Sequence, residues 1–208
     1  MIIPRRNGCM RANDLGFVLI EFLVASALSL IVLTGIYSVL TEIQRWTSYQ
    51  REAQDVIYNA RSALETVQRI LRQAANNPYN ISMTGVLVGS STNVHIQSDI
   101  TGSLGPGEPD KGDPDGDIED SGEDITIRYN PAARTLELIS GGGSAQPFAN
   151  YITGFSLQYY DASGAITSVG DDVRYISVDI SAATTLLHPQ TRSAFGIRLS
   201  SGVPISNR

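Results

Sequence analysis

The sequence predicts an α+β fold in which one long N-terminal helix packs on an antiparallel β-sheet. Three observations predict it: an apolar run over residues 17–40, a helical stripe that continues to residue 74, and period-two alternation after Pro78. Of the 208 residues, 42% are hydrophobic and 17% are charged. This composition provides enough apolar material for a folded core.

The apolar run over residues 17–40 has the length of a membrane-spanning helix. Its 24 residues contain one charge, Glu21, and at about 1.5 Å per residue they cover a hydrocarbon core of roughly 30 Å. Three arginines (Arg5, Arg6 and Arg11) precede the run, and basic flanks stay on the cytoplasmic side. The sequence therefore predicts a single-pass protein with a cytoplasmic N-terminus and an external head.

Two simpler interpretations of this run leave features unexplained. Residues 25–27 (Ala-Ser-Ala) look like a signal-peptidase site, but the run continues to Leu40 and Glu21 interrupts it. A plain membrane anchor explains the length but gives no reason for Glu21, whose burial in lipid costs about 3 kcal/mol.

The stretch Gly16-Phe17-Val18-Leu19-Ile20-Glu21 resembles the prepilin cleavage and methylation motif of type IV pilins and type II secretion pseudopilins. The resemblance implies that prepilin peptidase cuts after Gly16, that Phe17 becomes the N-methylated first residue, and that Glu21 falls at the fifth mature position. The new amine is cationic, so a carboxylate on a neighbouring subunit can neutralise it and favour one assembly register. Met10 offers a second possible start, with a seven-residue leader.

The resemblance also implies a fold, a location and partners. It implies a pilin fold with a leader (1–16), a filament-core helix (17–40), an amphipathic helix (41–77) and a β-rich head (78–208). Ser38 stands where major pilins usually carry a kinking proline, which favours a minor pilin or pseudopilin of the PilW/PulJ type. Such a subunit would sit in the bacterial inner membrane with a periplasmic head. Its partners would be prepilin peptidase, the assembly platform and other pilins, in a priming or tip complex.

The helix is expected to continue beyond the apolar run. Ten positions at alternating spacings of three and four form one stripe: Ile43, Trp46, Gln50, Ala53, Ile57, Ala60, Leu64, Val67, Leu71 and Ala74. Charged residues, Glu52 among them, are expected on the other sides, and Asn76-Asn77-Pro78 is expected to end the helix. A coiled coil would fit this spacing, but packing on the chain's own sheet is favoured because sheet faces need a cover.

Period-two alternation predicts the strands of that sheet. Candidate strands are 86–88, 94–97, 125–129, 136–138, 155–159, 166–169, 176–180 and 195–199. Residues 130–133 and 161–164 are expected to form hairpin turns. Residues 141–144 (Gly-Gly-Gly-Ser) are expected to be a flexible joint between the first hairpin and the rest of the head.

Residues 105–124 form an acidic loop, with nine acids between Glu108 and Asp124. A solvated loop is the simplest interpretation; a calcium site is the other, because calcium takes several carboxylate and carbonyl oxygens. Comparison with an EF-hand fails at the turn glycine, where Ile118 stands. The candidate ligands are Asp113, Asp115, Asp117, Glu119, Asp120, Glu123 and Asp124, and calcium would have a structural role beside the strand that follows.

Composition argues against several other functions. The net charge of −6 disfavours binding to nucleic acid phosphates. The single cysteine, Cys9, lies in the leader, and neither His95 nor His188 has a metal-ligand or catalytic companion in sequence. We therefore expect a non-catalytic protein. The alternative to a filament subunit is a membrane-anchored, calcium-dependent binding or adhesion module.

Overall fold

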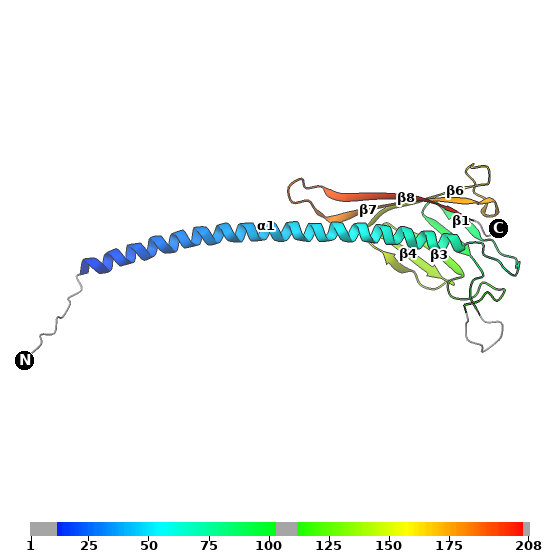
Figure 1. Ribbon diagram of the computed structural model, residues 1–208, viewed down its shortest axis with the longest axis horizontal. Helices are drawn as coiled ribbons and strands as arrows, with labels where there is room; N and C mark the ends of the chain where they lie inside the picture. Colours follow the sequence, from blue (N-terminus) through cyan, green and yellow to red (C-terminus); the bar gives the residue numbers. More distant parts are fainter. Residues whose placement is uncertain (1–11, 103–111, 206–208) are drawn as a thin grey trace, which may run out of the picture. The chain divides into compact units, whose positions relative to one another are not determined.

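A computed structural model describes residues 12–102 and 112–205, with side chains from residue 19 onward. One helix, α1 (Ala12–Gln73), precedes eight strands and a short 3₁₀ helix, η1 (Gly170–Asp172) (Figure 1). The chain divides between Ser48 and Tyr49 into two compact units. α1 stops at Gln73, before the end that the sequence predicted at residues 76–78, and Ala75 adopts a left-handed conformation with φ of 64°.

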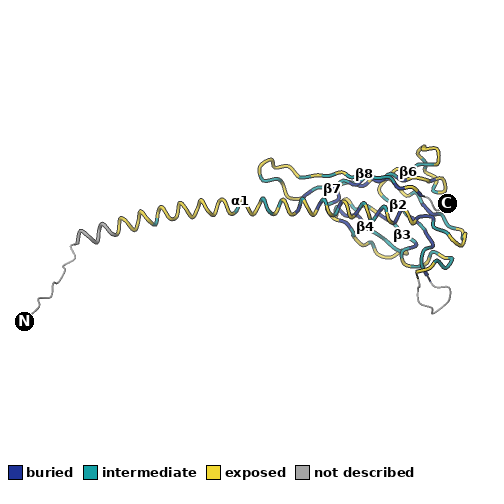
Figure 2. The backbone as a smooth tube through the Cα atoms, viewed as in Figure 1, coloured by how far each residue is buried: buried dark blue, intermediate teal, exposed yellow. Residues whose placement is uncertain are grey.

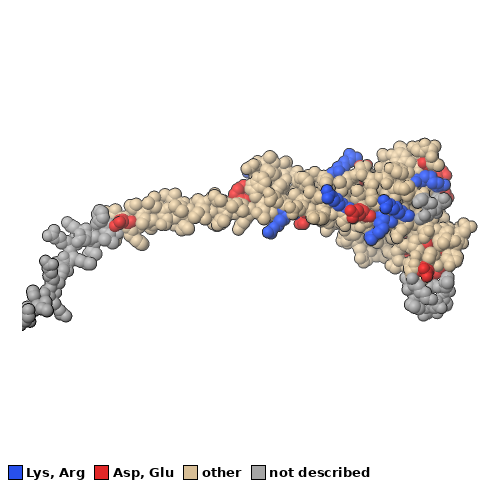
Figure 3. Space-filling model, in the orientation of Figure 1, with Lys and Arg blue, Asp and Glu red and all other residues tan. Residues whose placement is uncertain are grey.

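The first unit contributes the apolar part of α1. By length and composition α1 is a helix able to cross a membrane, and the apolar window that qualifies it is wholly unburied. Signal sequences near an N-terminus share these properties. Acidic and basic side chains are sparse along this stretch and gather on the unit of residues 49–208 (Figure 3).

The second unit contains two antiparallel sheets, so the expectation of a single sheet is wrong. The larger sheet has the order β1 (Val86–Ser90), β2 (Asn93–Gln97), β3 (Asp124–Asn130), β4 (Thr135–Ser140) and β5 (Gln146–Ala149). The smaller sheet has the order β6 (Ile152–Tyr160), β7 (Tyr175–Leu187) and β8 (Ala194–Pro204). The chain passes from one sheet to the other at Tyr151, whose φ of 65° takes the backbone out of the β5 direction.

One apolar core joins the second half of α1 to both sheets. From the helix it takes Val56, Ala60, Ala63, Val67, Ile70, Leu71 and Ala74, and from the sheets residues such as Ile96, Ile127, Leu157 and Ile180. Figure 2 shows burial concentrated on these helical turns and on the strands around them. The α+β class and the packing of the helix on the chain's own strands are therefore as predicted.

Glu52 lies on the buried face of α1, so the prediction that this charged residue faces solvent is wrong. Its carboxylate accepts hydrogen bonds from the backbone N–H groups of Thr185 (2.8 Å) and Leu186 (2.9 Å) and from the Thr185 hydroxyl. Burial raises the pKa of Glu52, but these hydrogen bonds and the charge of Arg134 outweigh it and leave the pKa lowered. Glu52 thus fastens the end of β7 to the helix.

Two further expectations about the head are wrong. Residues 166–169 form no strand: the segment meets β6 only through a bridge between Ile166 and Tyr160 and a hydrogen bond from the Thr167 N–H to the Tyr159 carbonyl (3.0 Å), and Ile166 is 73% exposed. The segment 141–144 is not a joint between the hairpin and the rest. It contains the turn that leads β4 back into β5, with Gly141 and Gly142 at positive φ.

Candidate functional site

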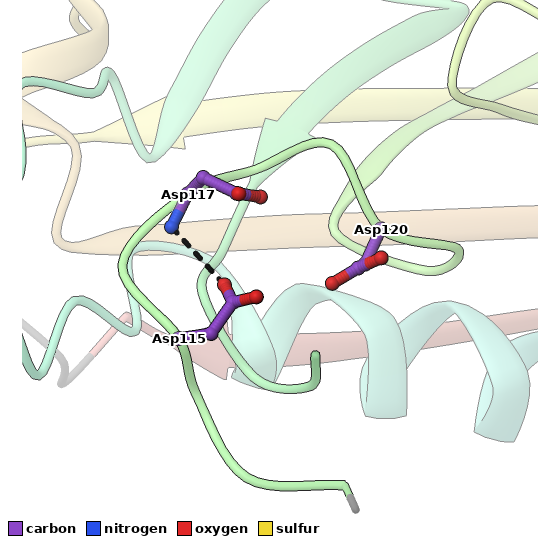
Figure 4. A group of neighbouring side chains, drawn as sticks. All are labelled: Asp115, Asp117 and Asp120. Carbon is purple, nitrogen blue, oxygen red and sulfur yellow. Dashed lines mark hydrogen bonds between the residues drawn. The ribbon is translucent and has the colours of Figure 1, made fainter. Parts of the chain in front are cut away.

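Three aspartates of the acidic loop converge in the segment between β2 and β3. Carboxylate oxygens of Asp115, Asp117 and Asp120 lie within 4.8 Å of one another, and the three side chains turn toward a common point (Figure 4). Asp117 is exposed, and the other two are partly buried. This cluster could hold a metal ion.

The loop backbone is shaped by its own carboxylates. Asp115 Oδ1 accepts a hydrogen bond from the Asp117 N–H at 3.3 Å, and Asp117 Oδ1 accepts one from the Glu119 N–H at 2.9 Å. Such Asx turns favour a tight, alternating path. Gly116, between the first two aspartates, has a φ of 96°, which suits a residue without a Cβ. Alternation brings the oxygens of residues 115 and 117 to the same side.

Asp99, which the sequence analysis did not single out, lies beside this loop and is fully buried. Its Oδ1 accepts a hydrogen bond from the Asp115 N–H at 3.2 Å, while its Oδ2 is buried without a hydrogen-bond partner in the described part of the chain. The backbone of Asp99 is held by Asn76, just beyond α1, through bonds of 2.8 and 3.0 Å. In the sequence, the only indication that Asp99 contacts this loop is its position shortly after β2, because the acid-dense stretch begins later, at Glu108.

Gly102 makes room for two of the clustered carboxylates. A Cβ at this position would lie 2.4 Å from Asp115 Oδ2 and 2.5 Å from Asp120 Oδ2, and the φ of 139° also disfavours other residues. Any side chain would therefore push the two oxygens apart. A glycine here allows the backbone to approach the carboxylates closely.

Glu123 and Asp124, two of the predicted calcium ligands, are engaged in other interactions. Glu123 is fully buried and accepts hydrogen bonds from the N–H groups of Ile100 (2.8 Å), Thr101 (3.0 Å) and Asp120 (3.3 Å). Burial raises its pKa and these bonds offset only part of that effect. The Glu123 carboxylate therefore links the segment that contains Ile100 and Thr101 to the segment that contains Asp120.

Asp124 Oδ1 lies 2.5 Å from His95 Nε2 across the β2–β3 ladder, so His95 has an acidic partner that sequence spacing did not reveal. The remaining two predicted ligands, Asp113 and Glu119, are exposed and lie outside the group of three. Of the seven predicted ligands, the structure thus groups Asp115, Asp117 and Asp120.

The predicted processing site lies at the start of α1. Gly16 and Phe17 are within the helical backbone, outside the range whose side chains are described. Glu21 is exposed and is surrounded along the helix by Ile20, Val24 and Leu28. Residues 1–11, part of the predicted leader, and the acidic residues Glu108 and Asp110 lie outside the described residues.

The chain matches no family model, and comparison with curated proteins and with solved structures gives no match either.

Proposed function

We propose that this protein is a non-catalytic minor pilin or pseudopilin subunit, assembled through α1 into a type IV pilus or a type II secretion pseudopilus. The observation that carries the proposal is the apolar surface of α1, on which Glu21 is the single charge between Leu19 and Leu40. The α+β head with a helix packed on antiparallel strands is compatible with a pilin fold.

The exposed apolar surface requires an apolar environment. Phe22 is 73% exposed and Ile31 is 69% exposed, and large apolar residues continue along this part of the helix. Soluble monomers rarely expose contiguous apolar patches beyond a few hundred Å². Lipid would cover this surface before assembly, and the equivalent helices of neighbouring subunits would cover it in the filament.

Glu21 gives this surface a defined register. An acidic side chain in lipid costs about 3 kcal/mol on insertion scales, so an unpaired Glu21 disfavours the membrane-embedded state. Cleavage between Gly16 and Phe17 creates a cationic amine near the same depth. A neighbour's amine can then pair with Glu21, and only one stagger of the two helices allows it.

The proposal assigns a pathway to the protein. Prepilin peptidase removes residues 1–16 at the inner membrane and Phe17 is N-methylated. Before assembly, the subunit resides in the inner membrane as a single-pass protein with its head in the periplasm. The assembly platform then moves it into the filament. The lack of a proline at Ser38 supports a minor subunit of a priming or tip complex.

Mass spectrometry of the N-terminus tests this function directly. In a host with its own prepilin peptidase, the mature chain is expected to start at N-methyl-Phe17. A chain that starts at Leu28 would indicate an ordinary secreted protein, and an intact leader would indicate a plain membrane anchor; either result contradicts the proposal.

Replacement of the helix charge gives a second test. Glu21→Ala is expected to abolish incorporation into filaments while membrane insertion survives. Glu42→Ala is the matched control, because Glu42 is an acid on the same helix beyond the apolar run, 4.0 Å from Arg45. Normal incorporation of Glu21→Ala would refute the register argument.

The carboxylate cluster supports calcium as a structural ion of the head. Hard divalent cations prefer oxygen ligands, and calcium accepts irregular sets of carboxylates. The same cluster favours the second candidate function, a membrane-anchored, calcium-dependent binding or adhesion module outside any filament. Such a module would keep its leader and would tolerate Glu21→Ala, so the two tests above separate the candidates.

A further inference from the structure

The outer face of the smaller sheet carries short polar side chains and is open to solvent. It consists of the residues that alternate with the buried ones: even-numbered residues 154–160 of β6, odd-numbered residues 175–181 of β7 and even-numbered residues 196–202 of β8, none of which is buried. Most of them are serine or glycine, and the strand register aligns them in rows. The charged residues of this face, Asp179 and Arg198, pair with each other at 3.2 Å. The face is therefore polar and close to neutral.

Two tyrosines stand at one end of this face. Tyr160 and Tyr175 are opposite each other in the register of β6 and β7, and their ring centroids lie 5.8 Å apart at an interplanar angle of 61°. With Asp161, Gly164 and Ser177 they line a hollow of about 360 Å³. Small-molecule sites in proteins typically span about 300–1,000 Å³. The hollow is therefore large enough for a small ligand or for one end of a longer one.

Gly202 allows the Tyr175 side chain to lie along the sheet. A Cβ on Gly202, in the neighbouring strand, would lie 1.4 Å from the Tyr175 hydroxyl oxygen and 2.1 Å from Cζ, so the end of the ring occupies the place where a side chain would stand. The ring is therefore held low over β8, and Tyr175 remains 42% exposed. An aromatic ring held in this way can support a ligand that stacks on it.

Polar groups surround the two rings. Asp161 Oδ1 accepts hydrogen bonds from the Ser163 N–H (2.8 Å), the Ser163 hydroxyl (2.7 Å) and the Ala165 N–H (2.9 Å), and these bonds lower the pKa of Asp161. Oδ2 takes part in none of them and remains an acceptor for a ligand. The Tyr160 hydroxyl donates to Gln158 Oε1 at 2.8 Å, which leaves the NH₂ group of that amide as a donor.

We propose that this face binds a neutral, β-linked glycan, with one sugar ring on Tyr175 and the following rings over the serine rows. A β-linked sugar with equatorial hydroxyls has apolar faces of C–H groups and a rim of hydroxyls. Its apolar face matches an aromatic ring, and its rim matches the hydroxyl, amide and carboxylate groups around that ring. An extended chain of such sugars is flat and fits a sheet face of short side chains.

Charge and hydrogen bonding separate this ligand from others. Asp161 is the ionised residue of the hollow, and its charge disfavours phosphate groups and therefore nucleic acid. A quaternary ammonium ion would contact the tyrosines and Asp161 but would use none of the serine rows. An apolar peptide would cover the hydroxyls of those rows without pairing them, which costs free energy. Glycan binding by the head is a function beyond filament assembly through α1.

Isothermal titration calorimetry of the full chain tests the proposal. The chain is held in a polyoxyethylene detergent, because its headgroup contains no sugar that would compete. The probes are hexamers of β-1,4-linked glucose and of β-1,4-linked N-acetylglucosamine, and at least one of them is expected to bind. Maltohexaose, whose α-linked chain curves, is expected to bind at least about tenfold more weakly. Tetramethylammonium serves as the probe for a cation site.

Substitutions at Tyr175 and Gly202 locate the binding. Tyr175→Ala is expected to weaken glycan binding at least about tenfold, whereas Tyr175→Phe keeps the ring and should stay within about threefold of wild type. Gly202→Ala leaves every lining side chain in place but displaces the Tyr175 ring, and should also lose at least about tenfold. Tyr58→Ala is the matched control, because Tyr58 is a 75% exposed tyrosine of α1 outside this face.

Binding of neither β-linked hexamer, equal affinity for maltohexaose, or wild-type affinity in Tyr175→Ala would overturn the proposal. Binding of tetramethylammonium without binding of the hexamers would identify a cation site and overturn it as well. The unfolding temperature is measured beside each affinity. If Tyr175→Ala or Gly202→Ala unfolds early, Tyr175→Leu decides, since it keeps apolar bulk without a flat ring and must also weaken binding. Glycan binding does not depend on processing at Phe17, so the filament assignment is tested separately.

Discussion

Replacement of Glu52 by alanine should destabilise the head by about 2–4 kcal/mol. The carboxylate accepts three hydrogen bonds from Thr185 and Leu186, and hydrogen bonds to charged groups contribute about 1.5–3 kcal/mol each. The total stays well below the sum of these values because Thr185 and Leu186 are exposed, so water can reach the two backbone N–H groups that the substitution releases. Glu52→Gln keeps one acceptor oxygen but turns an NH₂ group toward a donor, and should cost about 1–2 kcal/mol.

Urea unfolding of the full chain in detergent measures these differences, and hydrogen exchange at the amides of Thr185 and Leu186 locates them. The matched control is Glu65→Ala, an exposed acid on the same helix, which should change stability by less than about 0.5 kcal/mol. If Glu52→Ala and Glu65→Ala have equal stability and the two amides exchange at the wild-type rate, the proposed fastening of β7 to α1 is refuted.

Three further predictions follow from burial and charge. Because the folded pKa of Glu52 lies below its ordinary value of 4.5, its stabilisation is present above that pH and is lost as the pH falls through the folded pKa; the stability difference between wild type and Glu52→Gln should shrink below about pH 4.5 in urea titrations. Leu71→Ala should cost about 2–5 kcal/mol by the same assay because Leu71 is fully buried, whereas Ile166→Ala, at a 73% exposed position, should cost less than about 0.5 kcal/mol; equal costs would contradict the assigned core. Asp124→Asn should cost about 1 kcal/mol or less, since Asp124 and His95 are each about one-third exposed; a loss above about 3 kcal/mol would indicate a larger role for this pair.

The sequence alone determined the features that depend on local order. The length of the apolar run, the end of α1 near Asn76 and the hairpin of β3 and β4 follow from periodicity and turn residues within a few positions of one another. The acidic loop was also identified from composition, and three of its aspartates do gather.

The tertiary structure decided the features that depend on partners distant in sequence. β6 pairs along its length with β7, which begins 15 residues after β6 ends, and no local pattern specifies that pairing. A charge pattern places Glu52 on the outside of α1, yet two backbone donors 133 and 134 residues away compensate its burial. The contact of Asp99 with the acidic loop has the same origin: folding brings the segment after β2 against the loop, where Asp99 accepts a hydrogen bond from the Asp115 N–H, and a single carboxylate outside an acid-rich stretch gives no local signal of that contact.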